Sequence, residues 1–76
     1  MKLLYVFHTR IGSFYIGKQT GRFHPMYNDN SLGSYAKAWQ AAEDLAGGHT
    51  LSISGIDTAT LGIPADLAEW EKFSQS

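Results

Sequence analysis

Apolar and polar positions alternate through the first third of the chain. Residues 2–9 are rich in β-branched and aromatic side chains, which predicts a strand, and Gly12 suits the tight turn that follows it. A second strand is expected over residues 13–17 and a third over residues 22–27. Residues 18–21 between them read as a four-residue hairpin loop. The pattern therefore predicts a three-stranded antiparallel meander.

The two turns set an expected register for this meander. Phe7 should lie opposite Phe14, Tyr5 opposite Ile16, and Ile16 opposite Phe23. The face expected to be buried then carries Leu3, Tyr5, Phe7, Phe14, Ile16, Phe23 and Tyr27. The opposite face carries Val6, His8, Ser13, Tyr15, Arg22, His24 and Met26.

A helical period replaces the alternation after a turn-rich stretch. Ser34 is a suitable N-cap for a helix over residues 35–46, and Gly47-Gly48 is a suitable end. The apolar stripe of this helix comprises Tyr35, Ala38, Trp39, Ala42, Leu45 and Ala46. Trp39 is the largest member of the stripe, and we expect it to be buried against the sheet.

The last part of the chain predicts shorter elements. Residues 49–54 alternate like a fourth strand, and residues 57–60 resemble a side-chain-capped turn. Pro64 suits the first position of a helix that runs to about Phe73, with Ile63, Leu67 and Trp70 on one side. Residues 74–76 are expected to form a disordered tail.

These elements predict an α+β fold, in which a three-stranded antiparallel sheet packs on one α-helix with a short C-terminal strand and helix extension. At 76 residues the chain is expected to form a single domain over residues 1–73. Pro25 cannot donate to a ladder, so the third strand is expected at an edge, or with Pro25 turned outward. Cysteine is absent, which fits a reducing cytoplasm, and no apolar run is long enough to span a membrane.

The charges are unevenly distributed although the net charge is only −1. Residues 1–40 carry five Lys or Arg and one carboxylate, whereas residues 41–76 carry one Lys and six carboxylates. Basic side chains interleaved with aromatic ones suit a nucleic-acid backbone and its bases, although such domains are usually more basic overall. The candidate binding face consists of Arg10, Tyr15, Lys18, Arg22, His24 and Met26.

Other site chemistries have weaker support in the sequence. His8 and His24 should share a face, but no Cys or carboxylate joins them at the spacing that a zinc site needs. Either histidine could pair with Ser13, yet no third group orients such a base and no nucleophile elbow is present. We therefore expect no metal, no cofactor and no catalytic residue.

Nearly the whole chain resembles a family of short uncharacterised bacterial proteins. The resemblance rests on Thr9–Ile16, Gly21–His24, Leu32–Tyr35, Asp44–Gly48 and Leu61–Trp70. That family has no assigned activity, cofactor or binding residue, so the resemblance implies no site. The order of three strands and a helix is also similar to that of the phage-integrase arm-binding domains, which meet DNA through the sheet, but no motif is shared.

Together these patterns favour a small cytoplasmic module that binds a protein partner or associates with itself and has no catalytic activity. Nucleic-acid binding through the basic and aromatic face of the sheet is the alternative. An enzyme is the third and weakest interpretation.

Overall fold

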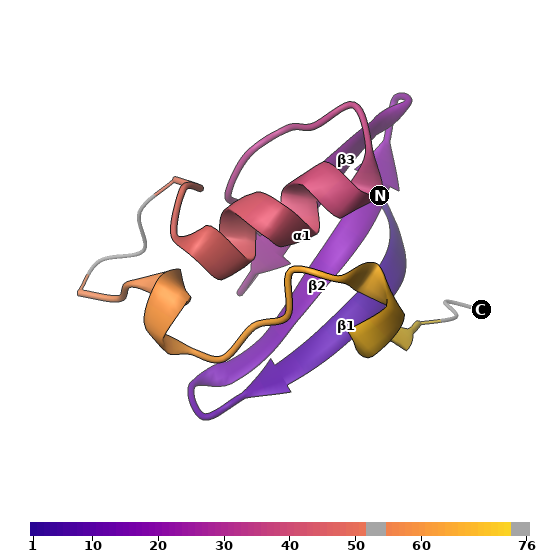
Figure 1. The fold of residues 1–76 in the computed structure, drawn as a ribbon. Helices are drawn as coiled ribbons and strands as arrows, with labels where there is room; N and C mark the ends of the chain where they lie inside the picture. Colours follow the sequence, from indigo (N-terminus) through magenta and orange to yellow (C-terminus); the bar gives the residue numbers. More distant parts are fainter. Residues whose placement is uncertain (52–54, 74–76) are drawn as a thin grey trace.

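The computed structural model describes residues 1–51 and 55–73 (Figure 1). In chain order the elements are β1 (Lys2–Thr9), β2 (Gly12–Gln19), β3 (Arg22–Tyr27), β4 (Asn30–Ser31), α1 (Ala38–Gly47), the 3₁₀ helices η1 (Thr58–Thr60) and η2 (Leu67–Glu69), and β5 (Glu71–Lys72). The α+β class is confirmed. The prediction of three strands is too low, because the two-residue strands β4 and β5 extend the sheet at both edges, giving the order β4-β3-β2-β1-β5.

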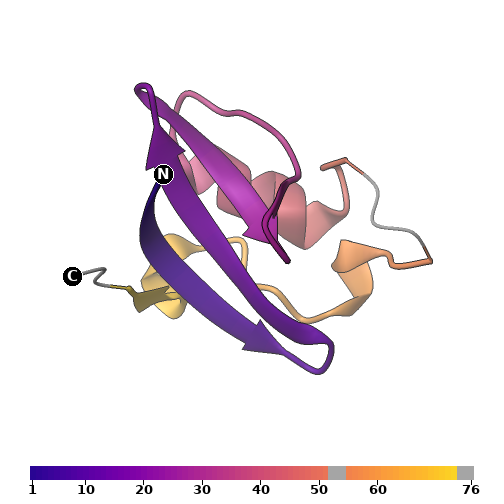
Figure 2. The ribbon, with the colours of Figure 1, turned by 180° about the vertical axis from the view of Figure 1, so that it is seen from behind.

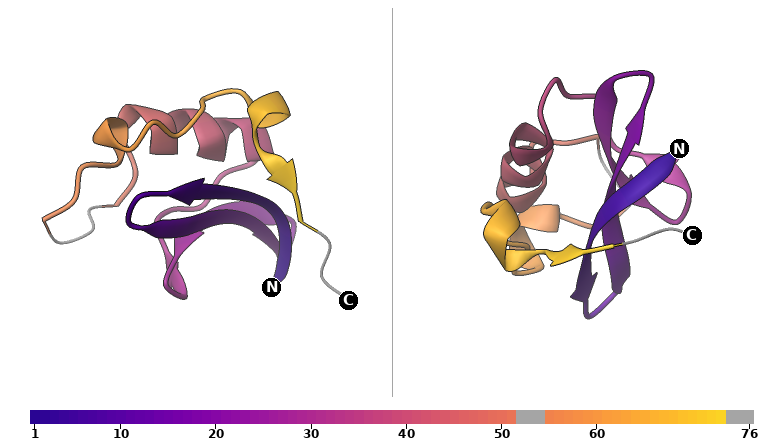
Figure 3. Two further views of the ribbon diagram at one scale, coloured as in Figure 1. Left: turned by 90° about the horizontal axis from the view of Figure 1, so that it is seen from below. Right: turned by 90° about the vertical axis from the view of Figure 1, so that its right-hand side faces the viewer.

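The molecule has two layers (Figure 3). One layer is the sheet, and the other is formed by α1 with the segment that carries η1 and η2. We call the sheet face that α1 covers the inner face, and the opposite one the outer face, which lies in front in Figure 2. The core between the layers includes Phe14, Ile16, Leu32, Ala41, Ala42, Leu45, Leu61, Ile63 and Trp70.

Tight turns fix the register of the central hairpins. Thr20 and Gly21 form the β2–β3 connection with φ values of 51° and 76°, as a two-residue turn of the primed type requires. This loop is shorter than the predicted four residues, so Ile16 lies opposite Pro25 and not opposite Phe23. The error is two residues, and side chains alternate with a period of two. The predicted faces of β2 and β3 therefore remain correct.

The register of β1 is confirmed over most of its length. Tyr5 pairs with Ile16, and Phe7 pairs with Phe14, as expected. An irregularity between Leu3 and Tyr5 then places Leu3 opposite Gly17. Since an extra residue in one strand reverses the faces beyond it, Leu3 lies on the outer face. Its predicted place in the core is wrong.

Pro25 lies in an interior strand, so the predicted edge position is wrong. Its carbonyl accepts a hydrogen bond from Leu32 N at 2.8 Å, away from β2. In an antiparallel strand the N and O of one residue point to the same side. An N–H at Pro25 would point away from β2, so its absence removes no hydrogen bond to β2. The alternative prediction, that Pro25 faces outward from the ladder, is therefore correct for the ladder with β2.

Helix α1 begins three residues later than predicted, at Ala38, and no side chain caps its first turn. The segment before it continues alongside β3, where Phe23 and Tyr35 exchange two backbone hydrogen bonds of 2.8 Å. Tyr35 thus has strand-like pairing and cannot start the helix. The predicted end is confirmed, because Gly48 takes a left-handed conformation and its N–H bonds to the carbonyl of Leu45 at 3.3 Å.

The two tryptophans differ in burial, and only Trp39 departs from its expected environment. The buried side of α1 is formed by Ala41, Ala42 and Leu45, and Trp39 is 50% exposed. Trp39 directly follows Ala38, so it lies about 100° round the helix from the stripe that starts there. Trp70 is only 5% exposed, and its indole N–H donates to the carbonyl of Pro64 at 2.9 Å. The prediction that Trp39 is a core residue is wrong.

The C-terminal segment forms no α-helix over residues 64–73, contrary to the prediction, and only the short 3₁₀ helix η2 lies there. Asp66 accepts a hydrogen bond from Ala68 N at 2.9 Å and caps the single turn η2, after which Trp70 is extended. β5 then pairs with β1.

The remaining predictions for the last third of the chain have different outcomes. The capped turn at Asp57 is confirmed, since its carboxylate accepts from Ala59 N at 3.0 Å. Residues 49–51 form no strand, and residues 52–54 and 74–76 of the predicted strand and tail lie outside the described residues.

Candidate interaction surface

The outer face of the sheet has an apolar centre. Tyr15 on the central strand β2 lies opposite Val6 on one side and Met26 on the other. Leu3 joins them because of the irregularity in β1. Gly17 leaves room for this arrangement, since a Cβ there would lie 3.2 Å from Leu3 Cδ2 and only 2.6 Å from Met1 Sδ.

The chain returns to this face at its C-terminal end. Phe73 N donates to the carbonyl of Leu4 at 2.8 Å, and the Phe73 ring meets the ring of Tyr15 edge-on with centroids 5.4 Å apart. Val6 lies opposite both Tyr15 and Glu71 and is only 4% exposed, although no helix covers it. Phe73 was not among the residues predicted for this surface, because the predicted helix ended there.

Two hollows accompany this apolar centre. The larger, of about 430 Å³, is lined by Leu3, Ser13, Tyr15, Met26, Asn28 and Asp29. It lies between the start of β1 and the β3–β4 hairpin, which both turn away from the helical layer in Figure 3. The second hollow, of about 360 Å³, lies at the β1–β5 edge and is lined by Lys2, Leu4, Tyr5, Lys72 and Phe73.

Two histidines of the outer face have hydroxyl neighbours. His8 Nδ1 lies 2.7 Å from Ser13 Oγ across the β1–β2 ladder. His24 Nδ1 lies 2.9 Å from the carbonyl oxygen of Gly33, which can only accept, so this nitrogen carries the proton and Nε2 has the lone pair in the neutral ring. Ser31 Oγ completes the cluster at 3.2 Å from the same nitrogen.

These pairs do not form a complete catalytic or metal site. Within residues 1–51 and 55–73, no three His, Cys, Asp or Glu side chains are grouped so that they could hold a metal ion. The nearest approach to nucleophilic chemistry is the His8–Ser13 pair, and the bonds described for His8 include no carboxylate that would orient it.

The six residues of the predicted binding face are only partly brought together. Tyr15, His24 and Met26 share the outer face, as expected. Lys18 lies opposite Phe23 on the inner side, with its ammonium 5.4 Å from the centroid of that ring. Lys18 therefore does not share the outer face with Tyr15, His24 and Met26.

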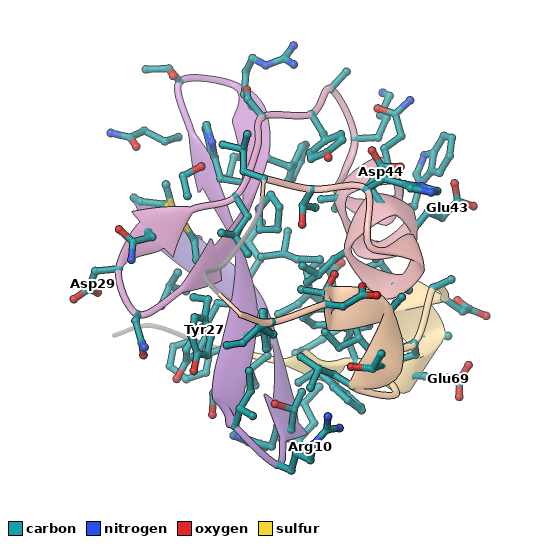
Figure 4. The ribbon with its side chains drawn as sticks, turned by 90° about the vertical axis from the view of Figure 1, so that its left-hand side faces the viewer. Arg10, Tyr27, Asp29, Glu43, Asp44 and Glu69 are labelled. Atoms are coloured by element: carbon teal, nitrogen blue, oxygen red, sulfur yellow. The ribbon has the colours of Figure 1, made fainter. Side chains whose placement is uncertain are left out.

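The two arginines are engaged with other parts of the chain. Arg10 lies at the far end of the β1–β2 hairpin, where its guanidinium donates to the carbonyl of Thr60 at 3.0 Å (Figure 4). Arg22 donates to the hydroxyl of Ser34 at 2.7 Å and to its carbonyl at 3.0 Å. Both side chains stabilise connections within the domain.

The asymmetry of charge along the sequence becomes an asymmetry between the layers. Residues 1–36, which form most of the sheet, carry four Lys or Arg and one carboxylate, and residues 37–73 carry two Lys and six carboxylates. Glu43, Asp44 and Glu69 lie on the helical layer, whereas Asp29 projects from the β3–β4 hairpin on the other side of the molecule (Figure 4). Asp29 is the single carboxylate among residues 1–36.

One ionisable group is clearly perturbed. Burial raises the pKa of Tyr35 to about 12, and a hydrogen bond from its hydroxyl to the carboxylate of Asp44 contributes in the same direction. Gly33 allows the ring to lie there, since a Cβ at that position would be 2.8 Å from Tyr35 Cε2. This contact ties the segment before α1 to the helix and lies apart from the outer face.

Comparison with known proteins found no matching family model, no similar curated protein and no similar solved structure. No helix within the described residues is long and apolar enough to cross a membrane.

Proposed function

We propose that this domain is a protein-binding module that uses the outer face of its sheet. The observation that carries the proposal is the hollow of about 430 Å³ whose apolar part is formed by Leu3, Tyr15 and Met26. Its polar part is formed by Ser13 and the Asn28-Asp29 turn. An apolar centre with a polar rim is the usual composition of a protein interface.

Nucleic-acid binding is the weaker candidate. Tyr15 and His24 on one face support it, because aromatic rings on a sheet can stack on bases. Against it, Lys18 lies on the inner side and both arginines donate to oxygens of the chain itself. Phosphate contacts supply most of the affinity of nucleic-acid-binding proteins, and this face offers few cations for them.

The module is proposed to act without catalysis and without a bound cofactor. In this interpretation the His8–Ser13 and His24–Gly33 contacts hold polar side chains in place around the apolar centre. We further propose a cytoplasmic location, since a small domain without cysteine is suited to a reducing compartment.

Site-specific photocrosslinking in the source cells tests the proposal. A benzophenone amino acid at position 15 reports on the outer face, and the same group at Trp39, an exposed aromatic position on the other layer, is the matched control. We expect a crosslinked protein product from position 15 that is absent from position 39. Equal labelling from both positions, or none from position 15, would contradict the proposal.

A further inference from the structure

The larger hollow of the outer face combines an apolar part with a single charge. Its apolar part consists of Leu3, Tyr15 and Met26, and none of these side chains is fully buried. Among the described residues that line the hollow, Asp29 is the only one with a formal charge. A ligand of the hollow therefore meets apolar surface and a carboxylate together.

The β3–β4 turn holds this carboxylate at the rim. Asn28 and Asp29 have φ values of 49° and 65°, the two positive values that a two-residue turn of the primed type requires. The Asp29 side chain projects away from the helical layer (Figure 4) and is exposed. Within residues 1–51 and 55–73, its carboxylate has no ion-pair or hydrogen-bond partner. The negative charge is thus available to a ligand.

The cations of the sheet layer do not neutralise this charge. Lys2 and Lys18 lie opposite each other on the inner side of the sheet. Arg10 and Arg22 both donate to oxygens elsewhere in the chain. Arg22 also precedes Met26 by four residues, which is about 14 Å along a strand. The hollow therefore lies away from the basic side chains.

Strand pairing adds a second carboxylate to the outer face. Glu71 lies opposite Val6, and Val6 lies opposite Tyr15, so Glu71 belongs to the same face at its β5 edge. Glu71 is exposed and has no ion-pair partner in the part of the chain that the structure describes. The apolar centre consequently has a carboxylate on either side, at Asp29 and at Glu71.

An apolar surface beside an unpaired carboxylate suits a side chain that has an apolar stem and a cationic end. Lysine and arginine have this form, and they place the stem on apolar surface while the charged end stays polar. Arginine can also stack on an aromatic ring and bind a carboxylate through two parallel hydrogen bonds. Of the two, arginine therefore matches the hollow better.

From these observations we infer that the partner of the outer face is a protein segment rich in basic and apolar residues. An arginine side chain of that segment occupies the larger hollow, with its stem against Tyr15 and Met26 and its guanidinium at the carboxylate of Asp29. This inference rests on the proposed function and states the chemistry of the partner.

Selection of phage-displayed random dodecapeptides on the purified chain tests the inference. We expect the selected peptides to be enriched in arginine and lysine beside apolar residues. One selected peptide, and a copy with citrulline in place of each arginine, are then titrated into the ¹⁵N-labelled chain. The arginine peptide should shift the amides of Tyr15, Met26 and Asp29. The citrulline copy keeps the shape but loses the charge, so it should bind about tenfold more weakly.

Two variants of the chain locate the contact. Asp29→Asn removes the charge with a side chain that tolerates the positive φ, and should weaken binding of the arginine peptide about fivefold. It should leave the affinity for the citrulline copy unchanged. Glu43→Gln is the matched control, because it removes one exposed carboxylate from the helical layer and should change neither affinity. The pair separates a contact at Asp29 from general attraction of a basic peptide to an acidic chain.

Three results would overturn the inference: a selection that yields no basic peptides, equal losses for Asp29→Asn and Glu43→Gln, or shifts that leave the lining of the hollow unmoved. Amide signals of Tyr15 and Met26 that move with the concentration of the chain alone would also overturn it, since a second copy would then occupy the face. Crosslinking at position 15 separates these failures from failure of the proposed function. If position 15 captures a protein while the peptide experiment fails, only the basic partner is removed. If position 15 captures nothing, both proposals fall.

Discussion

The ring of Phe73 packs edge-on against the ring of Tyr15, with centroids 5.4 Å apart, although the two residues are 58 positions apart in the sequence. Through this contact the C-terminal end of the described chain covers part of the outer face and holds β5 beside β1. The contact links the stability of the sheet edge to the shape of the candidate surface.

Phe73→Ala should therefore loosen β5 and uncover Val6. Loss of a partly buried aromatic contact is expected to lower the free energy of unfolding by about 1–2 kcal/mol. Chemical denaturation measures the change in the free energy of unfolding. Hydrogen exchange at the amides of Glu71 and Lys72 should also become faster in this variant. Leu51→Ala is the control, since Leu51 is 65% exposed and its truncation should change stability by less than about 0.5 kcal/mol. Equal stability of the two variants would show that the ring contact contributes nothing.

The two tryptophans predict opposite results of the same substitution. Trp70 is buried among core residues and donates a hydrogen bond to Pro64, so Trp70→Ala should cost about 3–5 kcal/mol and unfold much of the population. Trp39→Ala, at a half-exposed position, should cost less than about 0.5 kcal/mol. Thermal melts measure both effects, and acrylamide should quench the fluorescence of Trp39 more strongly than that of Trp70. A destabilised Trp39→Ala variant would contradict the observed packing.

The sequence could predict those parts of the fold that depend on local alternation. The faces of β2 and β3 rest on a period of two, so they survived an error in loop length. Leu3 could not be placed because an irregularity in one strand leaves no signal in the alternation. The start of α1 was misplaced because the pairing of Tyr35 with Phe23 competes with the helix, and this pairing is tertiary.

The candidate site was predictable to a similar extent. Tyr15, His24 and Met26 were placed on one face by alternation alone. Phe73 was missed because the side-chain cap at Asp66 ends the helical turn early, and only the pairing of the following residues with β1 brings its ring to Tyr15. In the sequence, Asp29 indicated only a turn. Its position at the rim of the larger hollow follows from the fold of the β3–β4 hairpin.

Tyr35 predicts a specific loss of stability at high pH. Its pKa in the folded state is about 12, above the value of 10.0 expected for an unperturbed tyrosine. The folded state therefore favours the protonated phenol, and this contribution is complete below pH 10 and is lost as the pH rises toward 12. Unfolding measured across this range should show a smaller decline for Tyr35→Phe than for the wild type. Identical declines would indicate that the hydroxyl of Tyr35 ionises as easily in the folded chain as in the unfolded one.

The hydrogen bond from His24 to Gly33 predicts one tautomer of the neutral ring. Nδ1 should carry the proton and Nε2 the lone pair, the reverse of the form that usually dominates in free histidine. Long-range ¹⁵N–¹H correlation spectra of the neutral ring distinguish the two forms. His49, whose ring has no described hydrogen bond to a carbonyl, provides an internal comparison. Finding Nε2–H as the major form of His24 would mean that the contact with Gly33 does not persist in solution.

The dispersion of the basic side chains predicts a shallow salt dependence for any binding of nucleic acid. If Arg10, Lys18 and Arg22 acted together, three phosphate contacts would give a slope of log K against log salt near −2 to −3. Arg10 instead lies at the far end of the β1–β2 hairpin and Lys18 on the inner side, so only Arg22 borders the outer face. We expect a slope no steeper than about −1 in titrations with short single strands, followed by amide shifts. Arg22→Gln should abolish what binding there is, and Arg10→Gln should leave it unchanged. A slope near −3, with shifts at all three cations, would favour the nucleic-acid function over the protein-binding one.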